Sequence, residues 1–182
     1  MKKIVGFILI STMFVVLPQV LLAEEVCGGQ IQVNPDCEQV SSKWQMSCCP
    51  SGYEVIGVAQ SVAADQMQAG HAICRNQTKG NVFIATRTYK PNPVLLLCEE
   101  GETLAALQYK KNKKINAIQA LSVGCENKGT LQVRQNKLIG LSKKDKVIET
   151  SKGSSRQVVG IAQKSVENSE TANVSCLSLI TK

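Results

Sequence analysis

Apolar and polar residues alternate in short runs along most of this chain, and long helical periodicity is scarce. This alternation predicts strands at 53–59, 82–89, 94–98, 103–109, 131–134, 137–141, 157–162 and 173–180. Glycine, proline and asparagine supply the turns between them. One segment, Val62–Ala69, favours helix through its Ala, Gln and Met residues, as a single helical turn inside a long hairpin loop.

The strand pattern recurs three times, with cysteines at its boundaries. The front strands centre on Gly57, Ala106 and Gly160, and the closing strands end at cysteines spaced 51 residues apart, Cys74, Cys125 and Cys176. A fixed period of this size indicates a repeat architecture. The sequence therefore predicts an all-β fold of three pseudo-repeats of antiparallel strands, arranged as a β-prism, barrel or sandwich, at about 48–97, 98–151 and 152–182.

Alternation also predicts which side chains share a face. On the first front strand, Val55, Gly57 and Ala59 fall on one face and Val58 on the other. A small residue in mid-strand, such as Gly57, lets another backbone approach closely. Counting back from each closing cysteine places three polar residues at equivalent outward positions: His71, Ser122 and Asn173.

Residues 1–23 have the features of a secretory signal peptide. Lys2 and Lys3 precede an apolar run, Ile4–Leu17, and Ala23 is a small residue at a plausible cleavage site. The run is shorter than the roughly 20 residues that span a bilayer, so we expect cleavage rather than a retained anchor. No later segment approaches membrane length, and we expect a secreted or periplasmic protein without a transmembrane segment.

The eight cysteines all follow the predicted signal peptide. An even number in an exported chain predicts disulfides rather than a metal site, and with one histidine and no C-x-x-C pair we expect neither metal nor cofactor. The repeat favours Cys49–Cys74 and Cys98–Cys125. Lys152 stands at the matching position of the third copy, so we expect Cys48–Cys176 and a local Cys27–Cys37 bridge. Residues 24–47 would then form an N-terminal strap, outside the repeat pattern and tied to the repeats at 48–182.

The formal net charge is +7, and it becomes +5 without residues 1–23, which hold two lysines and no acidic residue. A modest surplus favours contact with anionic glycans, envelope polymers or lipid headgroups, whereas nucleic acid does not fit an exported chain without a basic aromatic motif. Four lysines gather at one predicted hairpin tip and are the candidate ligand-binding residues: Lys110, Lys111, Lys113 and Lys114. The alternative is a solvated tip that keeps strand edges from aggregating.

Catalytic chemistry has little support in the sequence. His71 is the only histidine, and the repeat aligns it with a serine and an asparagine, as expected of an ordinary outward strand residue. We therefore predict no catalytic residues and a non-enzymatic binding or structural module, whose expected ligands are anionic or saccharide polymers. Two alternatives stay open: a secreted enzyme with a cleft built from loops, and a ligand-free structural or effector scaffold.

Three antiparallel units with a C-x-x-G opening, an apolar strand and a closing strand that ends in cysteine resemble the vitelline membrane outer layer proteins. The likeness spans about residues 48–179 and is strongest at Ile115–Leu121, followed by Cys125. The resemblance implies a secreted, disulfide-rich, threefold β-prism. Four lysines and one asparagine, 110–114, stand where the family usually has an acidic cluster.

Overall fold

Three antiparallel sheets make up the part of the chain that the computed structural model describes: residues 27–63, 66–86, 93–112, 116–127, 130–134, 147–153, 156–166 and 173–182. The strands are β1 (Gln30–Ile31), β2 (Gln45–Cys48), β3 (Tyr53–Ala63), β4 (Gln66–Asn76), β5 (Val82–Ile84), β6 (Val94–Leu97), β7 (Thr103–Asn112), β8 (Ala117–Asn127), β9 (Thr130–Arg134), β10 (Val147–Ser151), β11 (Val158–Val166) and β12 (Asn173–Thr181). One short helix, α1 (Pro35–Glu38), accompanies them in the described ranges. The all-β prediction is confirmed.

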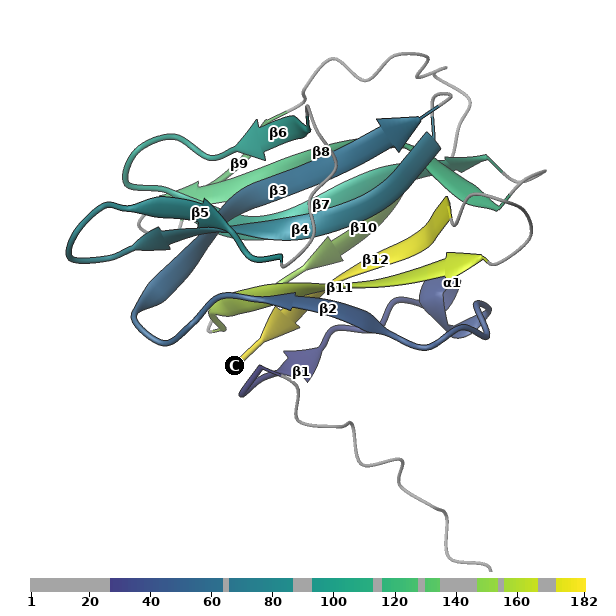
Figure 1. Cartoon of the computed structure of the whole chain (residues 1–182), viewed down its shortest axis with the longest axis horizontal. Coiled ribbons are helices and arrows are strands. Elements are labelled where there is room, and N and C mark those ends of the chain that lie inside the picture. The colour runs from purple at the N-terminus through teal and green to yellow at the C-terminus, as the bar shows by residue number, and fades with distance from the viewer. Residues whose placement is uncertain are drawn as a thin grey trace, which may run out of the picture.

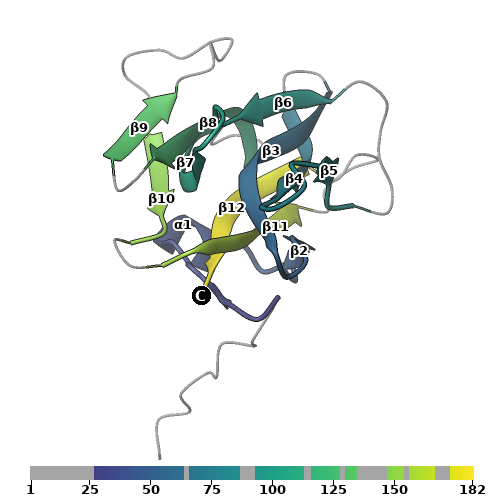
Figure 2. The ribbon, with the colours of Figure 1, turned by 90° about the vertical axis from the view of Figure 1, so that its left-hand side faces the viewer.

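Each sheet is a long hairpin flanked by two shorter strands. The strand orders are β5-β4-β3-β6 in the first sheet, β9-β8-β7-β10 in the second and β1-β12-β11-β2 in the third. The long hairpins β3-β4, β7-β8 and β11-β12 turn their inner faces toward one another (Figures 1 and 2). The expected three pseudo-repeats are therefore present.

The three hairpins share their irregularities as well as their strand order. Each front strand carries a bulge near its start, at Ile56, Ala105 and Val159, and a second register shift near the tip. The residue that follows each of the flanking strands β2, β6 and β10 donates its N–H to the carbonyl of the bulged residue in the front strand of the same sheet: Cys49 to Val159 at 3.0 Å, Cys98 to Ile56 at 2.8 Å and Lys152 to Ala105 at 2.9 Å. These three equivalent hydrogen bonds show that the threefold pseudosymmetry extends to individual backbone contacts.

One apolar core joins the three sheets. Its buried members come from all three hairpins and include Val55, Val58, Leu107, Leu121, Ile161 and Leu179. Val55 and Val58 both belong to this core, so the expectation that they face opposite sides is wrong. The bulge between Val55 and Gly57 adds one residue to the strand, and this reverses the alternation that follows it.

Small residues let the flanking strands approach the front strands, as the sequence predicts. A Cβ added at Gly160 would lie 2.7 Å from the carbonyl oxygen of Ser47, and one at Gly57 would collide with the carbonyl of Leu96. Both glycines pair with the last residue of a flanking strand, Cys48 in β2 and Leu97 in β6. Backbone crowding therefore keeps these two positions free of a side chain.

The N-terminal segment is part of the repeat architecture. β1 pairs with β12, and β2 pairs with β11, so this segment supplies both flanking strands of the third sheet. β2 precedes the first hairpin and pairs with the third, just as β6 and β10 each pair with the hairpin before them. The strap thus closes the three sheets into a ring, instead of lying outside the pattern.

Four disulfides tie this arrangement together in the described residues. Cys49–Cys74 and Cys98–Cys125 are confirmed. The expected Cys48–Cys176 and Cys27–Cys37 bridges are wrong, because the bonds are Cys27–Cys48 and Cys37–Cys176. β1 and β2 lie on opposite edges of the third sheet, so Cys27–Cys48 connects those two edges, and Cys37 reaches Cys176 because α1 packs against β12.

The closing strand of the third copy departs from the sequence alignment. Cys74 lies opposite Val55 and Cys125 opposite Leu104, but Thr181, not Cys176, lies opposite Val158. The equal cysteine spacing is therefore not a structural equivalence in the third copy. Ser178, rather than Asn173, occupies the place of His71 and Ser122.

The helical alternative for Val62–Ala69 is wrong in the described residues, because β3 continues to Ala63 and β4 begins at Gln66. Residues 64–65 lie outside the description, as do the predicted strand at 137–141 and the later part of 82–89. Among the described residues, no helix is long and apolar enough to span a membrane.

Candidate functional site

The lysine-rich tip is only partly within the described residues. Lys110 and Lys111 lie near the end of β7, whereas Lys113 and Lys114 fall outside the description. The ammonium of Lys111 is 2.8 Å from the Oδ2 atom of Asp36 in α1, and the two side chains are 12% and 21% exposed. Lys111 therefore holds the strap to the second sheet. A ligand role for all four lysines stays a prediction.

A buried tyrosine extends this contact between the strap and the second sheet. The hydroxyl of Tyr109 accepts a hydrogen bond from Nδ2 of Asn34 at 3.2 Å and lies 3.4 Å from Oδ2 of Asp36. Burial raises the pKa of Tyr109, so its hydroxyl keeps its proton. The cluster joins the N-terminal segment to β7, and its chemistry is structural.

His71 lies on the outer face of the first sheet, opposite Ala59 in β3. Its side chain is half-buried, and burial lowers its pKa below the usual 6.5. The outward orientation agrees with the sequence prediction. Ala59 and Ile73, its neighbours on this face, belong to a small apolar cluster that offers no acid or base.

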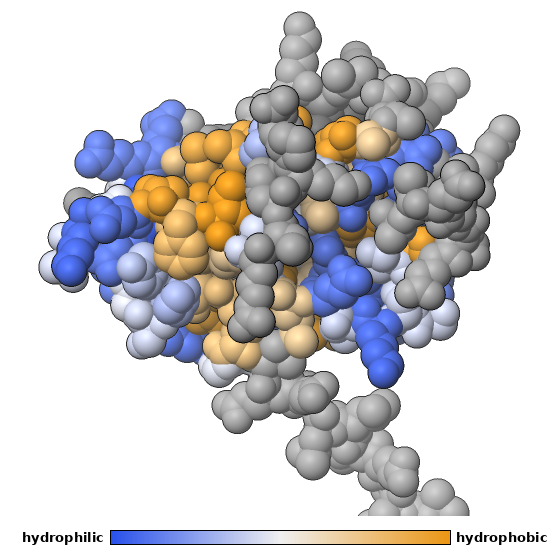
Figure 3. Space-filling view, viewed as in Figure 1, coloured by the Kyte–Doolittle hydropathy of each residue, from blue (hydrophilic) through white to orange (hydrophobic). Residues whose placement is uncertain are grey.

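Apolar side chains are exposed on both flanking strands of the first sheet. In β6, Leu95 and Leu97 are 45% and 44% exposed, and in β5 Val82 and Phe83 are 54% and 38% exposed. They contribute to the orange area in the space-filling view (Figure 3). Patches of a few hundred Å² occur on many monomers, so this face does not identify a partner.

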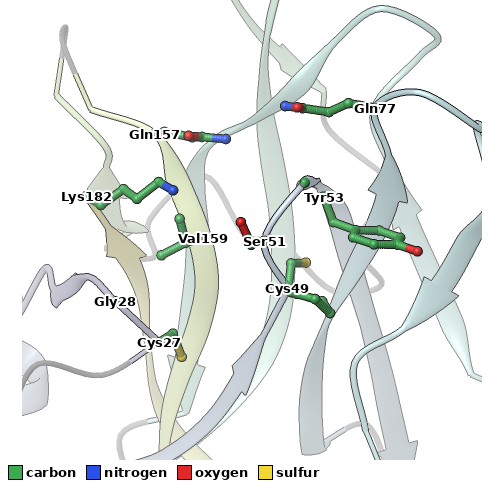
Figure 4. A pocket seen from close by; sticks show the side chains of 11 residues that line it. Cys27, Gly28, Cys49, Ser51, Tyr53, Gln77, Gln157, Val159 and Lys182 are labelled. Carbon is green, nitrogen blue, oxygen red and sulfur yellow. The ribbon is translucent and has the colours of Figure 1, made fainter.

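A pocket among the described residues lies where the third sheet meets the first, and we call it the closing pocket. Its volume is about 320 Å³. It is lined by Cys27, Gly28, Cys49, Pro50, Ser51, Gly52, Tyr53, Gln77, Gln157, Val159 and Lys182. These residues come from the beginning of the strap, the turn between β2 and β3, the first residue of β3, the residue after β4, the start of β11 with the residue before it, and the residue after β12 (Figure 4).

Polar groups surround this pocket. The amide ends of Gln77 and Gln157 point toward each other across it, and the ammonium of Lys182 points toward the same space (Figure 4). Two main-chain hydrogen bonds of 3.0 Å join Gln157 to Lys182, and the N–H of Gln77 donates to the carbonyl of Gly52 at 3.2 Å. The backbone that carries these side chains is therefore fixed, while their ends are exposed to solvent.

One wall of the pocket is rigid and partly apolar. The ring of Tyr53 packs edge-on against Phe83 with centroids 5.2 Å apart. The disulfides Cys27–Cys48 and Cys49–Cys74 enter the wall through Cys27 and Cys49. A preformed wall of this kind lowers the ordering cost of binding a ligand.

Sequence reasoning did not identify Gln77, Gln157 or Lys182 as site residues. They are far apart in the chain and carry no motif, and their meeting depends on the strap completing the third sheet. The one local signal was the turn Pro50-Ser51-Gly52, where Gly52 adopts a φ of +81°. That turn indicates a bend and no particular chemistry.

Comparison with known proteins finds no matching family model and no matching curated protein. Function therefore has to be inferred from the residues themselves. The four disulfides indicate an oxidising compartment outside the cytoplasm.

Proposed function

We propose that this protein is an exported, non-enzymatic binding module for saccharide polymers, and that the closing pocket is its binding site. The observation that carries this proposal is the lining of neutral hydrogen-bonding side chains, Ser51, Gln77 and Gln157, around a concave space. Amides and hydroxyls both donate and accept, as sugar hydroxyls do. A volume of about 320 Å³ suits one or two units of a longer chain.

The lining also favours binding over catalysis. Its titratable side chains in the described residues, apart from the bonded cysteines, are Tyr53 and Lys182. A glycosidase needs a pair of carboxylic acids on either side of the scissile bond. The Tyr53 ring packs against Phe83, and Lys182 offers a positive charge, which suits recognition.

The threefold set of sheets supports the proposal that the fold is a β-prism related to the vitelline membrane outer layer proteins. Matching bulges, and a matching hydrogen bond from the residue after each flanking strand to the bulged residue of the front strand, are what three copies of one unit would retain. An exported protein stabilised by four disulfides suits a role at the cell envelope or outside the cell. Secretion and periplasmic retention are both compatible with this role.

A saccharide array followed by calorimetric titration of the best ligand tests the proposal. We expect the double variant Gln77→Ala, Gln157→Ala to bind at least about tenfold more weakly, because two side chains that bind hydroxyls are lost. Gln66→Ala, at the far end of the first hairpin, is the matched control and should bind as the native protein does. Absence of binding to any saccharide, or equal binding by the double variant, would contradict the proposal.

A further inference from the structure

The three junctions between sheets can be compared position by position. At the open end of each hairpin, just before the bulge, two residues lie opposite each other: Glu54 and Arg75, Thr103 and Glu126, and Gln157 and Lys182. We call the junctions the first seam (first and second sheets), the second seam (second and third sheets) and the closing seam (third and first sheets). The closing pocket lies in the closing seam.

An ion pair fills the first seam. The Nε atom of Arg75 donates to Oε1 of Glu54 at 2.7 Å, and both side chains are less than a fifth exposed, at 17% and 18%. The same guanidinium reaches across the seam and donates from Nη2 to the carbonyl of Glu102 at 3.0 Å. The arginine therefore spans from the first sheet to the turn that leads into the second.

An ion pair also fills the second seam, with the charges reversed. Glu126 stands at the position of Arg75 and pairs with Lys152, which precedes the third hairpin. Each of these side chains is 17% exposed. Two of the three seams are thus closed by a charged residue at the same hairpin position, each with its counterion inside the protein.

The closing seam has a charged side chain at this position without a counterion from another described side chain. Lys182 occupies the position of Arg75 and Glu126, but its strand partner is the neutral Gln157, where the first sheet has Glu54. Within the described residues the structure contains no ion pair for Lys182, and none of the side chains that line the pocket is a carboxylate. The position that is filled in the other two seams is open here.

We propose that the counterion of Lys182 is supplied by the ligand, so that the saccharide bound in the closing pocket carries an anionic substituent such as a uronate carboxylate. This inference rests on the proposed function and narrows its ligand class. The carboxylate sits at Lys182, and the neutral hydroxyls of the same sugar lie against Gln77 and Gln157. The chain's formal net charge of +7, or +5 without the predicted signal peptide, assists the approach of an acidic polymer.

Lys182 is exposed, which sets the size and salt dependence of the effect. An exposed ion pair contributes a factor of about 2 to 5 in affinity, and salt screens it. The affinity of an acidic polymer increases more than that of a single acidic unit, because a neighbouring unit can bind Lys182 after the first one dissociates. We therefore expect a charge preference that is modest for a short oligomer at low salt and that fades as salt is added.

Two oligosaccharides of equal length and linkage, one of galactose and one of galacturonate, provide the test. Their affinities for the native protein, for Lys182→Gln and for the control Lys79→Gln are measured by calorimetry at low and high salt. Lys79 lies in the exposed turn after β4 but outside the pocket lining. We expect the native protein and Lys79→Gln to prefer the galacturonate about 2- to 5-fold at low salt. Lys182→Gln should bind both sugars equally.

The outcomes separate this inference from the proposed function. If the galactose and galacturonate oligomers bind the native protein equally, the anionic ligand is refuted while saccharide binding stands. If the preference survives in Lys182→Gln, the charge contact lies elsewhere and the inference is refuted. If neither oligomer nor any other saccharide binds, the proposed function fails, and this inference fails with it.

Discussion

The first seam and the closing seam have the same backbone and opposite character. At the first seam, Arg75 and Glu54 fill the junction with a partly buried ion pair that reaches the turn before β7. At the closing seam, Lys182 and Gln157 hold the same backbone positions around an open pocket of about 320 Å³. The threefold fold therefore determines where the sheets meet, and the two side chains at the equivalent positions determine whether an ion pair or a pocket occupies that place.

The two seams also differ in how the chain builds them. The first seam joins two sheets whose hairpins follow each other in sequence, whereas the closing seam joins the last hairpin of the chain to the first one. Two disulfides reach the wall of the closing pocket, through Cys27 and Cys49, and Cys37–Cys176, with a separation of 139 residues, ties the strap to β12. A binding site at the closing seam requires all three sheets to be in place. Variants that disrupt the ring of sheets therefore test the comparison between the two seams.

The largest expected effect is loss of the strap disulfide. Replacing both Cys37 and Cys176 by serine releases a loop of 139 residues and should lower the free energy of unfolding by about 5 kcal/mol in the chain-entropy model. Replacing Cys98 and Cys125, which are 27 residues apart, should cost about 3.5 kcal/mol. Denaturant unfolding of both variants checks the order. Equal costs would show that the strap does not depend on its long-range bond.

Backbone crowding gives the next largest effect. In Gly160→Ala the new Cβ would lie 2.7 Å from the carbonyl of Ser47, so β2 must shift, at a cost of about 1–3 kcal/mol in unfolding free energy. The second sheet already has an alanine at this place, Ala106, and Ala106→Gly should cost only about 0.5–1 kcal/mol. Chemical denaturation measures both. A neutral Gly160→Ala would contradict the close approach of the strap.

The seam charges predict a smaller difference. Arg75→Met leaves Glu54 without its partner in a position that is 18% exposed, and we expect a loss of about 1–2 kcal/mol. Lys182→Met removes no ion pair within the described residues and should change stability by less than about 0.5 kcal/mol. Equal losses of unfolding free energy in Arg75→Met and Lys182→Met would contradict the claim that the first seam has an ion pair and the closing seam has none among the residues described.

The smallest effect concerns pH. Because burial lowers the pKa of His71 in the folded state, the unfolded chain binds a proton more readily, and stability should fall as pH drops through 6.5 and below. His71→Ser gives the first sheet the residue that Ser122 and Ser178 provide in the others. Between pH 7.5 and 5, the melting temperature of His71→Ser should fall by less than that of the native protein. Parallel pH profiles would show that His71 makes no such contribution.

The sequence predicts the all-β class, the three copies and two of the disulfides, because these depend on local alternation and on short repeats. It fails at Val58, where a bulge reverses the alternation, since a single extra residue leaves no mark in an apolar run. It also fails at Cys176, whose equal spacing suggests an equivalence that the register of β12 does not have.

The site is harder to predict than the fold. The lysine tip is conspicuous in the sequence, yet Lys111 is engaged by Asp36. Gln157 and Lys182 are inconspicuous, and they become informative only when Glu54 and Arg75 are known to occupy the same positions in another sheet. That equivalence depends on strand register, which a weak repeat does not determine.

The most direct test of the closing seam is to give Lys182 the counterion that Arg75 has. Gln157→Glu places a carboxylate beside Lys182, and Gln157→Ala controls for loss of the amide. Titration with the galacturonate oligomer should show Gln157→Glu binding about 2- to 5-fold more weakly than Gln157→Ala, because the new carboxylate neutralises Lys182 and repels the ligand. Equal or tighter binding by Gln157→Glu would contradict the account.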